Sequence, residues 1–171
     1  MGLSRVDKPE DLGHALMGAL AYDDSVIIQH WVEGVEVSVT VLGIPGSEKV
    51  LPPVEIEVKE GIYDTDARLE TSRVNHFCPV RDESLAALGS NVDNARVALE
   101  QAACEVYRAY DCRDFARVDF IWDGHKVMVM GLKTFPGLTE TSLVPMAIEA
   151  AGLKRDEVLA HLVVGALERG N

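Results

Sequence analysis

Two apolar runs decide the fold, and a polar turn joins them: Ala116-Arg117-Val118-Asp119-Phe120-Ile121, then Asp123-Gly124-His125-Lys126, then Met128-Val129-Met130-Gly131-Leu132-Lys133. Apolar and β-branched runs on either side of a short turn with glycine predict a β-hairpin. Side chains alternate between the faces of a strand, so Arg117 and Asp119 share a face, as do Gly131 and Lys133. We therefore expect Asp119 and Lys133 to meet across the hairpin, and any chemistry to lie near them.

Periodicity elsewhere predicts the elements around this hairpin. Residues 35–42 alternate strictly between apolar and polar, which is typical of a half-buried antiparallel strand. The other expected elements are a strand over 49–57 with a bulge at Pro52-Pro53, a loop over 61–79, and helices over 91–110, 142–151 and 155–168. The predicted fold class is α+β, a mainly antiparallel sheet with helices packed on one face.

The first thirty residues predict a short helix–strand unit. We expect a strand stub over 1–6, a capping box from Asp7 to Glu10, a helix to about Tyr22 and a buried strand over 25–29. These few elements cannot close a sheet, and an unpaired strand edge invites association. The expected organisation is therefore a remnant at 1–30 and a main domain at 31–171, with a homodimer or hetero-complex formed through the N-terminal strand edge.

Composition excludes several classes of partner. The chain has 171 residues and a formal net charge of −12, so nucleic acid and anionic membranes are poor partners. No run approaches the roughly 18 to 20 apolar residues of a membrane span, and the acidic N-terminus is unlike a signal peptide, so we expect a cytoplasmic protein. Three cysteines without CxxC spacing argue against a disulfide framework and a zinc site.

A second motif carries a family resemblance. The segment Thr134-Phe135-Pro136-Gly137-Leu138-Thr139, followed by Ser142-Leu143-Val144-Pro145, together with Arg117-Val118-Asp119-Phe120, resembles the C-terminal catalytic domain of the D-alanine:D-alanine ligases, members of the ATP-grasp superfamily. The resemblance runs through nearly the whole chain. It implies that residues 1–30 are the tail of a larger nucleotide-binding subdomain, whose phosphate loop would precede Met1. It also implies ATP-dependent joining of a carboxylate to an amine, with a divalent metal on the phosphates.

The resemblance fails at the metal ligands. It implies metal ligation by Asp119, by a glutamate at position 131 and by an asparagine at position 133, but this chain has Gly131 and Lys133 there. The net charge of the ligand set rises from −2 to about zero, and Mg²⁺ binds hard oxygen donors. We therefore expect no magnesium or other cofactor on this chain alone. Either the Lys133 ammonium replaces the metal and holds a carboxylate or phosphate of a ligand, or it only neutralises Asp119.

The positions that the resemblance assigns to nucleotide have changed in part. The family's Glu-Lys pair before the tryptophan is Gln29-His30 here, and the second tyrosine of the family's loop motif is Leu69. If nucleotide binding is retained, the resemblance assigns it to Trp31, Val32, Glu36 and Arg68, with Glu36 on the ribose and Arg68 on phosphate. A solvated strand end is the alternative interpretation of Glu36.

The acceptor end is better preserved. The resemblance implies that Arg117 steadies the tetrahedral intermediate, and that Gly137 presents a backbone N–H to the oxyanion. It implies that Ser142 and Leu143 hold the carboxylate of the second amino acid. The alternatives are an ion pair across the strands for Arg117 and a helix N-cap for Ser142.

Three hypotheses of function follow. The first is a shortened ligase-like domain, not a self-sufficient ATP-dependent ligase, that binds a small amino-acid-like or carboxylate ligand, or acts on it without metal, through Arg117, Lys133 and Ser142. The second is a ligase completed by a partner chain, which would bring ATP and magnesium. The third is a non-catalytic interaction module.

Overall fold

The computed structural model describes residues 2–43, 47–59, 61–63 and 72–169. The chain forms two compact units, Val32–Ile56 with His76–Asn171, and Met1–Trp31 with Glu57–Asn75. The division into 1–30 and 31–171 that the sequence suggests stays a prediction.

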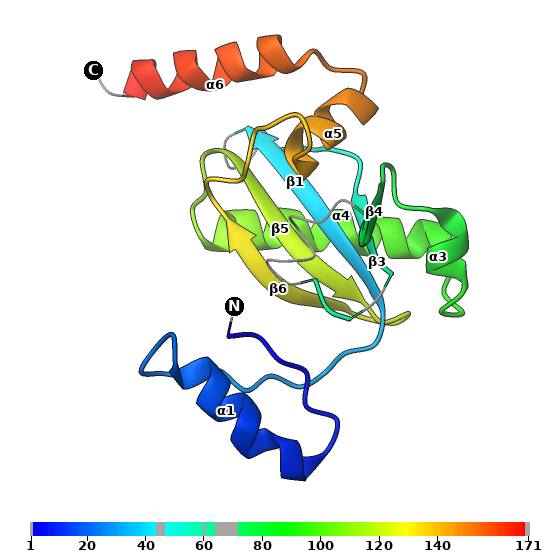
Figure 1. The fold of residues 1–171 in the computed structure, drawn as a ribbon. Coiled ribbons are helices and arrows are strands. Elements are labelled where there is room, and N and C mark those ends of the chain that lie inside the picture. Colours follow the sequence, from blue (N-terminus) through cyan, green and yellow to red (C-terminus); the bar gives the residue numbers. More distant parts are fainter. Residues whose placement is uncertain (1, 44–46, 60, 64–71, 170–171) are drawn as a thin grey trace. The chain divides into compact units, whose positions relative to one another are not determined.

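A mainly antiparallel sheet is the centre of the fold (Figure 1). Its strands run in the order β4-β3-β1-β5-β6, and β2 also pairs with β1. Their bounds are β1 Val35–Gly43, β2 Lys49–Val50, β3 Val54–Val58, β4 Val74–Phe77, β5 Asp114–Trp122 and β6 Val127–Lys133. The predicted hairpin is the β5–β6 pair, and the predicted α+β class is confirmed.

The long helix α4, Val92–Ala109, covers one face of the sheet (Figure 1). Its side chains at four-residue spacing are fully buried, because this spacing places them on one stripe of the helix: Ala95, Leu99, Ala103 and Tyr107. They form one core with Val37, Val39 and Val41 of β1 and with Ala116, Val118, Phe120 and Trp122 of β5. The helix begins one residue after the predicted start, and the side chain of Asn91 caps it by accepting a hydrogen bond from the backbone N–H of Asn94.

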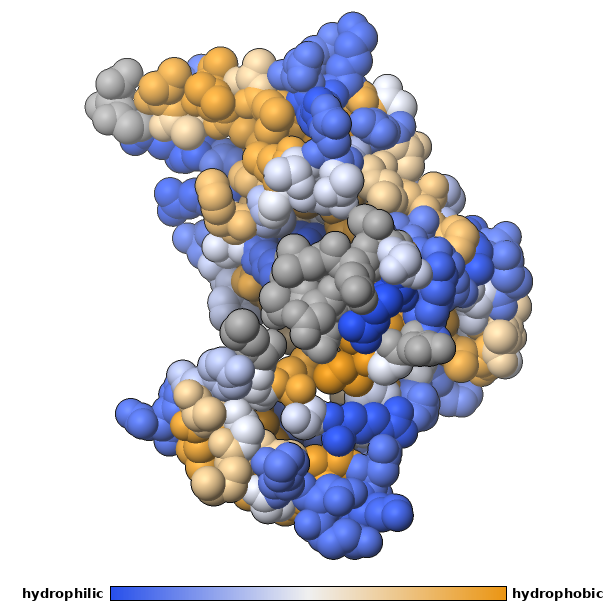
Figure 2. Space-filling view, viewed as in Figure 1, coloured by the Kyte–Doolittle hydropathy of each residue, from blue (hydrophilic) through white to orange (hydrophobic). Residues whose placement is uncertain are grey.

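Among the described residues, three further helices belong to the larger unit: α3 Asp82–Ala86, α5 Leu143–Ala150 and α6 Arg155–Arg169. The sequence predicts α5 and α6, but it does not predict α3. On α6 the outward side chains of Val163, Val164 and Leu167 are exposed, and Figure 2 shows this apolar stretch. Among the described residues, no helix combines the length and apolar character needed to cross a membrane.

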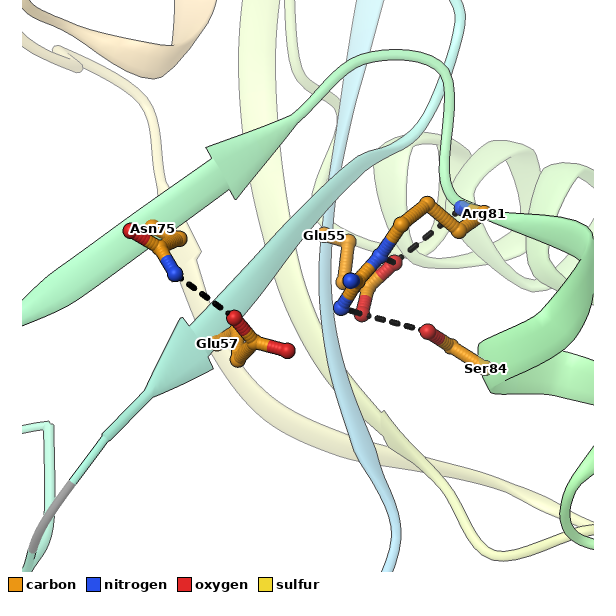
Figure 3. A network of polar contacts seen from close by, with 5 residues as sticks. All are labelled: Glu55, Glu57, Asn75, Arg81 and Ser84. Atoms are coloured by element: carbon orange, nitrogen blue, oxygen red, sulfur yellow. Dashed lines mark hydrogen bonds and ion pairs between the residues drawn. The ribbon is translucent and has the colours of Figure 1, made fainter.

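A buried ion pair fastens α3 to the sheet (Figure 3). Glu55 of β3 is 3% exposed and accepts hydrogen bonds from the Arg81 guanidinium, from the Arg81 backbone N–H and from the Ser84 hydroxyl. Arg81 also lies over the ring of Phe77, with its Cζ 3.6 Å from the centroid. The pKa of Glu55 is lowered, because these donors outweigh the effect of burial, which alone would raise it. The carboxylate is therefore held in its charged form.

The expectations for residues 49–79 need two corrections. The strand predicted over 49–57 is two strands, because Pro52 and Pro53 cannot donate to a ladder, and both strands pair with β1. The loop predicted over 61–79 contains β4, which follows β3 in the sheet order. Val74–Phe77 is too short to show a period in the sequence.

In the smaller unit the helix is confirmed and its flanks are not. A 3-10 turn, Pro9–Asp11, leads into α1, Leu12–Leu20. The predicted capping box is wrong, because Lys8 occupies the cap position without a side-chain hydrogen bond and Asp7 pairs with Arg5 instead.

The strand predicted over 25–29 does not form, and the described residues of the predicted stub, 2–6, are also irregular. A strand is stable only when a neighbour takes up its backbone hydrogen bonds, and no described strand pairs with either segment. Ile27 is 83% exposed and Ile28 is 69% exposed. These apolar residues therefore lack the burial that their sequence pattern suggests.

Candidate functional site

Strand register brings the polar residues of three strands to one face of the sheet. Ser38 of β1 lies directly opposite Asp119 of β5, and Asp119 lies opposite Gly131 of β6. Arg117 lies opposite Lys133 in the same way. Directly opposed residues point to the same face, so this face is polar where the other face packs on α4. The site is thus a consequence of the two-residue period of the strands.

Asp119 is at the centre of this face and accepts hydrogen bonds from three side chains. Its Oδ1 accepts from Ser38 Oγ and from Arg117 Nε, each at 2.9 Å. Its Oδ2 accepts from Arg117 Nη2 at 2.9 Å and from Lys133 Nζ at 2.7 Å. Two donors on each oxygen saturate the carboxylate, and the two-point contact with arginine is the strongest form of such a pair.

The electrostatics of the site follow from this bonding. Burial alone would raise the pKa of Asp119, but the hydrogen bonds and positive charges of Arg117 and Lys133 outweigh it and hold that pKa below its ordinary value. The pKa of Glu36, two residues from Ser38 on the same face of β1, is raised by burial and by the negative charge of Asp119. Arg117, Asp119 and Lys133 together carry one net positive charge, which the carboxyl of Glu36 on the same face opposes.

Exposure differs across the cluster. The side chain of Arg117 is 6% exposed, that of Asp119 is 20% exposed, and that of Lys133 is 42% exposed. Lys133 is therefore the member that a molecule from solution reaches first.

The acceptor-end residues form a second local group at the start of α5. The Ser142 hydroxyl lies 2.7 Å from the Thr139 hydroxyl. A Cβ at Gly137 would lie 2.9 Å from Ser142 Oγ, so this position does not accept a side chain without a shift. Ser142 stands at the N-cap position of α5, but its side chain makes no capping hydrogen bond. Leu143 is 4% exposed and packs in the interior.

The nucleotide-side residues are described only in part. In the smaller unit, the guanidinium of Arg5 lies 4.1 Å from the centroid of the Trp31 ring. Trp31 remains 45% exposed, while Val32 and Glu36 of the larger unit are partly buried. Arg68 lies outside the described residues. The assignment of these residues to nucleotide stays a prediction.

The structure thus brings three of the predicted residues into one cluster: Arg117, Asp119 and Lys133. The expected meeting of Asp119 and Lys133 is found, although the directly opposed residue of Asp119 is Gly131. The ion pair of Arg117 is with Asp119 on its own strand rather than across strands. In the described part of the chain, no hydrogen bond joins this cluster to Gly137 or Ser142.

Ser38 is the member of the cluster that sequence reasoning missed. It is 1% exposed and sits among the polar residues of β1 that alternate with buried valines. That alternation is the signal that could have identified it, since Glu36, Ser38 and Thr40 share a face. The pairing of β1 with β5 that gives Ser38 its partner is not readable from the sequence.

Comparisons with known proteins identify the family of the chain. Residues 1–164 match the family model described as "D-ala D-ala ligase C-terminus". A D-alanine--D-alanine ligase from Alcanivorax borkumensis is 32% identical over 172 residues, covering 99% of this chain and 52% of that protein. One from Halalkalibacterium halodurans is 31% identical, covering 99% of this chain and 53% of that protein. The chain therefore spans about half the length of these curated relatives.

Solved structures give the same result. The VanG D-Ala:D-Ser ligase from Enterococcus faecalis superposes with a TM-score of 0.75 at 26% identity, covering 95% of this chain and 45% of that one. A D-alanine--D-alanine ligase from Bacillus anthracis has a TM-score of 0.73 at 22% identity, which supports the fold. The sequence match and the shared fold extend over nearly the whole chain, and the chain belongs to the D-alanine:D-alanine ligase family, within the part that corresponds to the C-terminal domain.

Proposed function

We propose that this chain is a ligase-family domain that does not hold a catalytic magnesium ion at Asp119 and that binds a small carboxylate or amino-acid-like ligand without metal. One observation carries the proposal: the Lys133 ammonium occupies Oδ2 of Asp119, at a position where the family resemblance implies a neutral ligand. The proposal extends to metal-free chemistry on that ligand, with Arg117, Lys133, Gly137 and Ser142 as the residues involved.

The donor set does not fit magnesium. Mg²⁺ needs several oxygen ligands near octahedral geometry, and Asp119 already accepts two hydrogen bonds on each oxygen. Among the described residues, no group of three or more His, Cys, Asp or Glu side chains is placed to hold a metal. Two unit charges about 4 Å apart repel by about 4 kcal/mol at an effective dielectric of about 20, and a divalent ion beside Lys133 doubles this.

The exposed ammonium of Lys133 favours binding of a negatively charged ligand. Lys133 uses one of its three N–H groups on Asp119, so it retains donors for an anion. The acceptor group at Gly137 and Ser142 supplies a backbone N–H and a hydroxyl, which suit the rest of a small amino acid.

Ligand-dependent stability tests the proposal. A ligand present at about 100 times its dissociation constant adds about 2.7 kcal/mol to the free energy of unfolding. We expect thermal shifts with D-alanine or acetate in a buffer with EDTA, and no shift with Mg²⁺ and ATP. A shift that requires both Mg²⁺ and ATP, and that the Asp119→Asn variant loses, would contradict the proposal.

A second candidate function is ATP-dependent ligation completed by further polypeptide. It is favoured by the chain's coverage of about half of its relatives, 52% and 53% of their lengths. ATP and magnesium would then bind through residues supplied by a partner chain or by another part of the same protein. Release of ADP after mixing this chain with the N-terminal half of the Alcanivorax borkumensis relative, D-alanine, ATP and Mg²⁺ would support this candidate.

The third candidate is a non-catalytic interaction module. The exposed Ile27 and Ile28 favour it, because apolar residues of this size are seldom left in solvent together. We propose a homodimer or hetero-complex through residues 25–29, which can add as a strand to a partner's sheet. Sedimentation at micromolar concentration tests this association, with the chain alone and with the N-terminal half of the Alcanivorax borkumensis relative. A chain that stays monomeric in both experiments would exclude association through residues 25–29. The cytoplasmic location stays a prediction.

A further inference from the structure

We infer that Ser38 and Asp119 are positioning residues of a site for one carboxylate group, and that Arg117 and Lys133 supply the contacts to it. The inference rests on the proposed function, since it identifies the part of the ligand that the metal-free site would bind.

The first step of the argument is the role of Ser38. Its hydroxyl is buried, with the residue 1% exposed, and it donates to Oδ1 of Asp119 at 2.9 Å. It is also the directly opposed residue of Asp119 across the β1–β5 ladder, so the backbone of two central strands fixes the distance between the two side chains. Ser38 therefore fixes one oxygen of the carboxylate, which determines where the other oxygen points.

The second step is the orientation of the cations. Arg117 Nε and Nη2 bind the two oxygens of Asp119 side by side, so guanidinium and carboxylate adopt one relative orientation. Lys133 Nζ then takes the remaining position on Oδ2. A lysine side chain is otherwise free to adopt many conformations, so this contact holds its ammonium in advance of ligand binding.

The third step is the identity of the bound group. Within the described part of the chain, Arg117 Nη1 makes no hydrogen bond, and two of the three N–H groups of Lys133 make none. Arg117 and Lys133 are directly opposed across β5 and β6, so these free donors belong to neighbouring side chains. Arg117, Asp119 and Lys133 together carry one net positive charge, while the Glu36 carboxyl on the same face disfavours a second negative charge there. A carboxylate matches both features, because it has one negative charge and two acceptor oxygens, whereas a phosphate dianion has an excess charge.

Calorimetric titration with acetate, D-alanine and inorganic phosphate, in EDTA, tests the inference. The variants are Ser38→Ala, the conservative Ser38→Thr, and Ser84→Ala as the matched control. Ser84 is suitable because its hydroxyl also donates to a carboxylate, that of Glu55, at 2.7 Å and outside the cluster. Urea unfolding of each variant checks that the fold is intact.

We expect Ser38→Ala to bind acetate and D-alanine about tenfold more weakly, because Asp119 loses a charge-assisted hydrogen bond. Ser38→Thr should restore binding, and Ser84→Ala should leave it unchanged although its stability falls. Equal binding by the wild type and Ser38→Ala overturns the inference and leaves the proposed function standing. Tighter binding of phosphate than of acetate overturns the carboxylate assignment, and no binding of any probe by the wild type overturns the proposed function itself.

Discussion

Lys133 Nζ donates to Asp119 Oδ2 at 2.7 Å, although the residue directly opposite Asp119 on β6 is Gly131. The register of β5 and β6 shifts between Asp119 and Phe120, so that Phe120 opposes Val129 and Met130 is the extra residue. Asp119 therefore sits beside a strand irregularity with no side chain opposite it, and the lysine two residues along β6 reaches diagonally to its carboxylate. Lys133, rather than the directly opposed residue, therefore supplies the contact from β6.

Restoring the family's ligands should restore a metal site. A Cβ at Gly131 would meet nothing within 4 Å, so Gly131→Glu is sterically permitted. In the double variant Gly131→Glu with Lys133→Asn, Asp119 loses an ammonium and gains a neighbouring carboxylate. We expect calorimetry to detect Mg²⁺ binding by this variant and none by the wild type.

Two controls accompany that experiment. Gly131→Glu alone retains Lys133, which should take up the new carboxylate in an ion pair and prevent binding of the metal. Asp119→Asn in the double variant should abolish the gain. Magnesium binding by the wild type with similar affinity would contradict our interpretation of Lys133.

Removing Arg117 should be costly. Its side chain is 6% exposed and pairs with Asp119 through two hydrogen bonds, so Arg117→Ala leaves a largely buried carboxylate with fewer donors. Breaking one partner of a buried pair typically costs about 3–5 kcal/mol. Urea unfolding should show a loss near this range. Lys126→Ala, an exposed change on the same hairpin, should alter stability by less than about 0.5 kcal/mol.

Stability should fall in acid because of Glu55. The pKa of Glu55 in the folded protein is lowered from its ordinary value of 4.5. The ionised carboxylate therefore contributes its full stabilisation above pH 4.5, and this contribution is lost as the pH falls through the lowered pKa. Glu55→Gln should therefore destabilise the protein at pH 7 and flatten the decline of stability below pH 4.5. Chemical unfolding at a series of pH values measures both effects, and a decline as steep as that of the wild type would show that other carboxylates are responsible.

The exposed isoleucines should matter for association and not for stability. Ile27 and Ile28 are 83% and 69% exposed, so changing both to lysine removes little buried area. We expect the free energy of unfolding to change by less than about 0.5 kcal/mol. In sedimentation, any dimer or hetero-complex that forms through residues 25–29 should be lost. An association that persists in this variant would place the interface elsewhere.

The core under α4 offers a direct test of the fold. Leu99 is fully buried between the helix and the sheet, so Leu99→Ala should cost about 2–5 kcal/mol through lost contacts and a residual cavity. Val97, on the same helix and 50% exposed, is the matched control, and Val97→Ala should change stability little. A comparable loss in both variants would contradict the orientation of α4.

Prediction from sequence succeeded where a pattern was long or locally strong. The alternation over 35–42 and the apolar stripe of 91–110 became β1 and α4, because a repeated period requires one buried face. It failed for residues 25–29, where an apolar run of strand type has no described neighbour to pair with. It also missed Glu55 with Arg81, since a contact between residues 26 positions apart leaves no periodic signal.

The sequence by itself determined the family, the hairpin, and the presence of glycine and lysine where the resemblance implies two metal ligands. Those facts depend on residue identity and on the two-residue period of strands. The tertiary structure decided which partners Asp119 has, because Ser38 lies 81 positions away and meets it only through the pairing of β1 with β5. It also decided that Arg117 binds Asp119 within one strand, since a carboxylate in a buried place takes the nearest donors that the backbone presents.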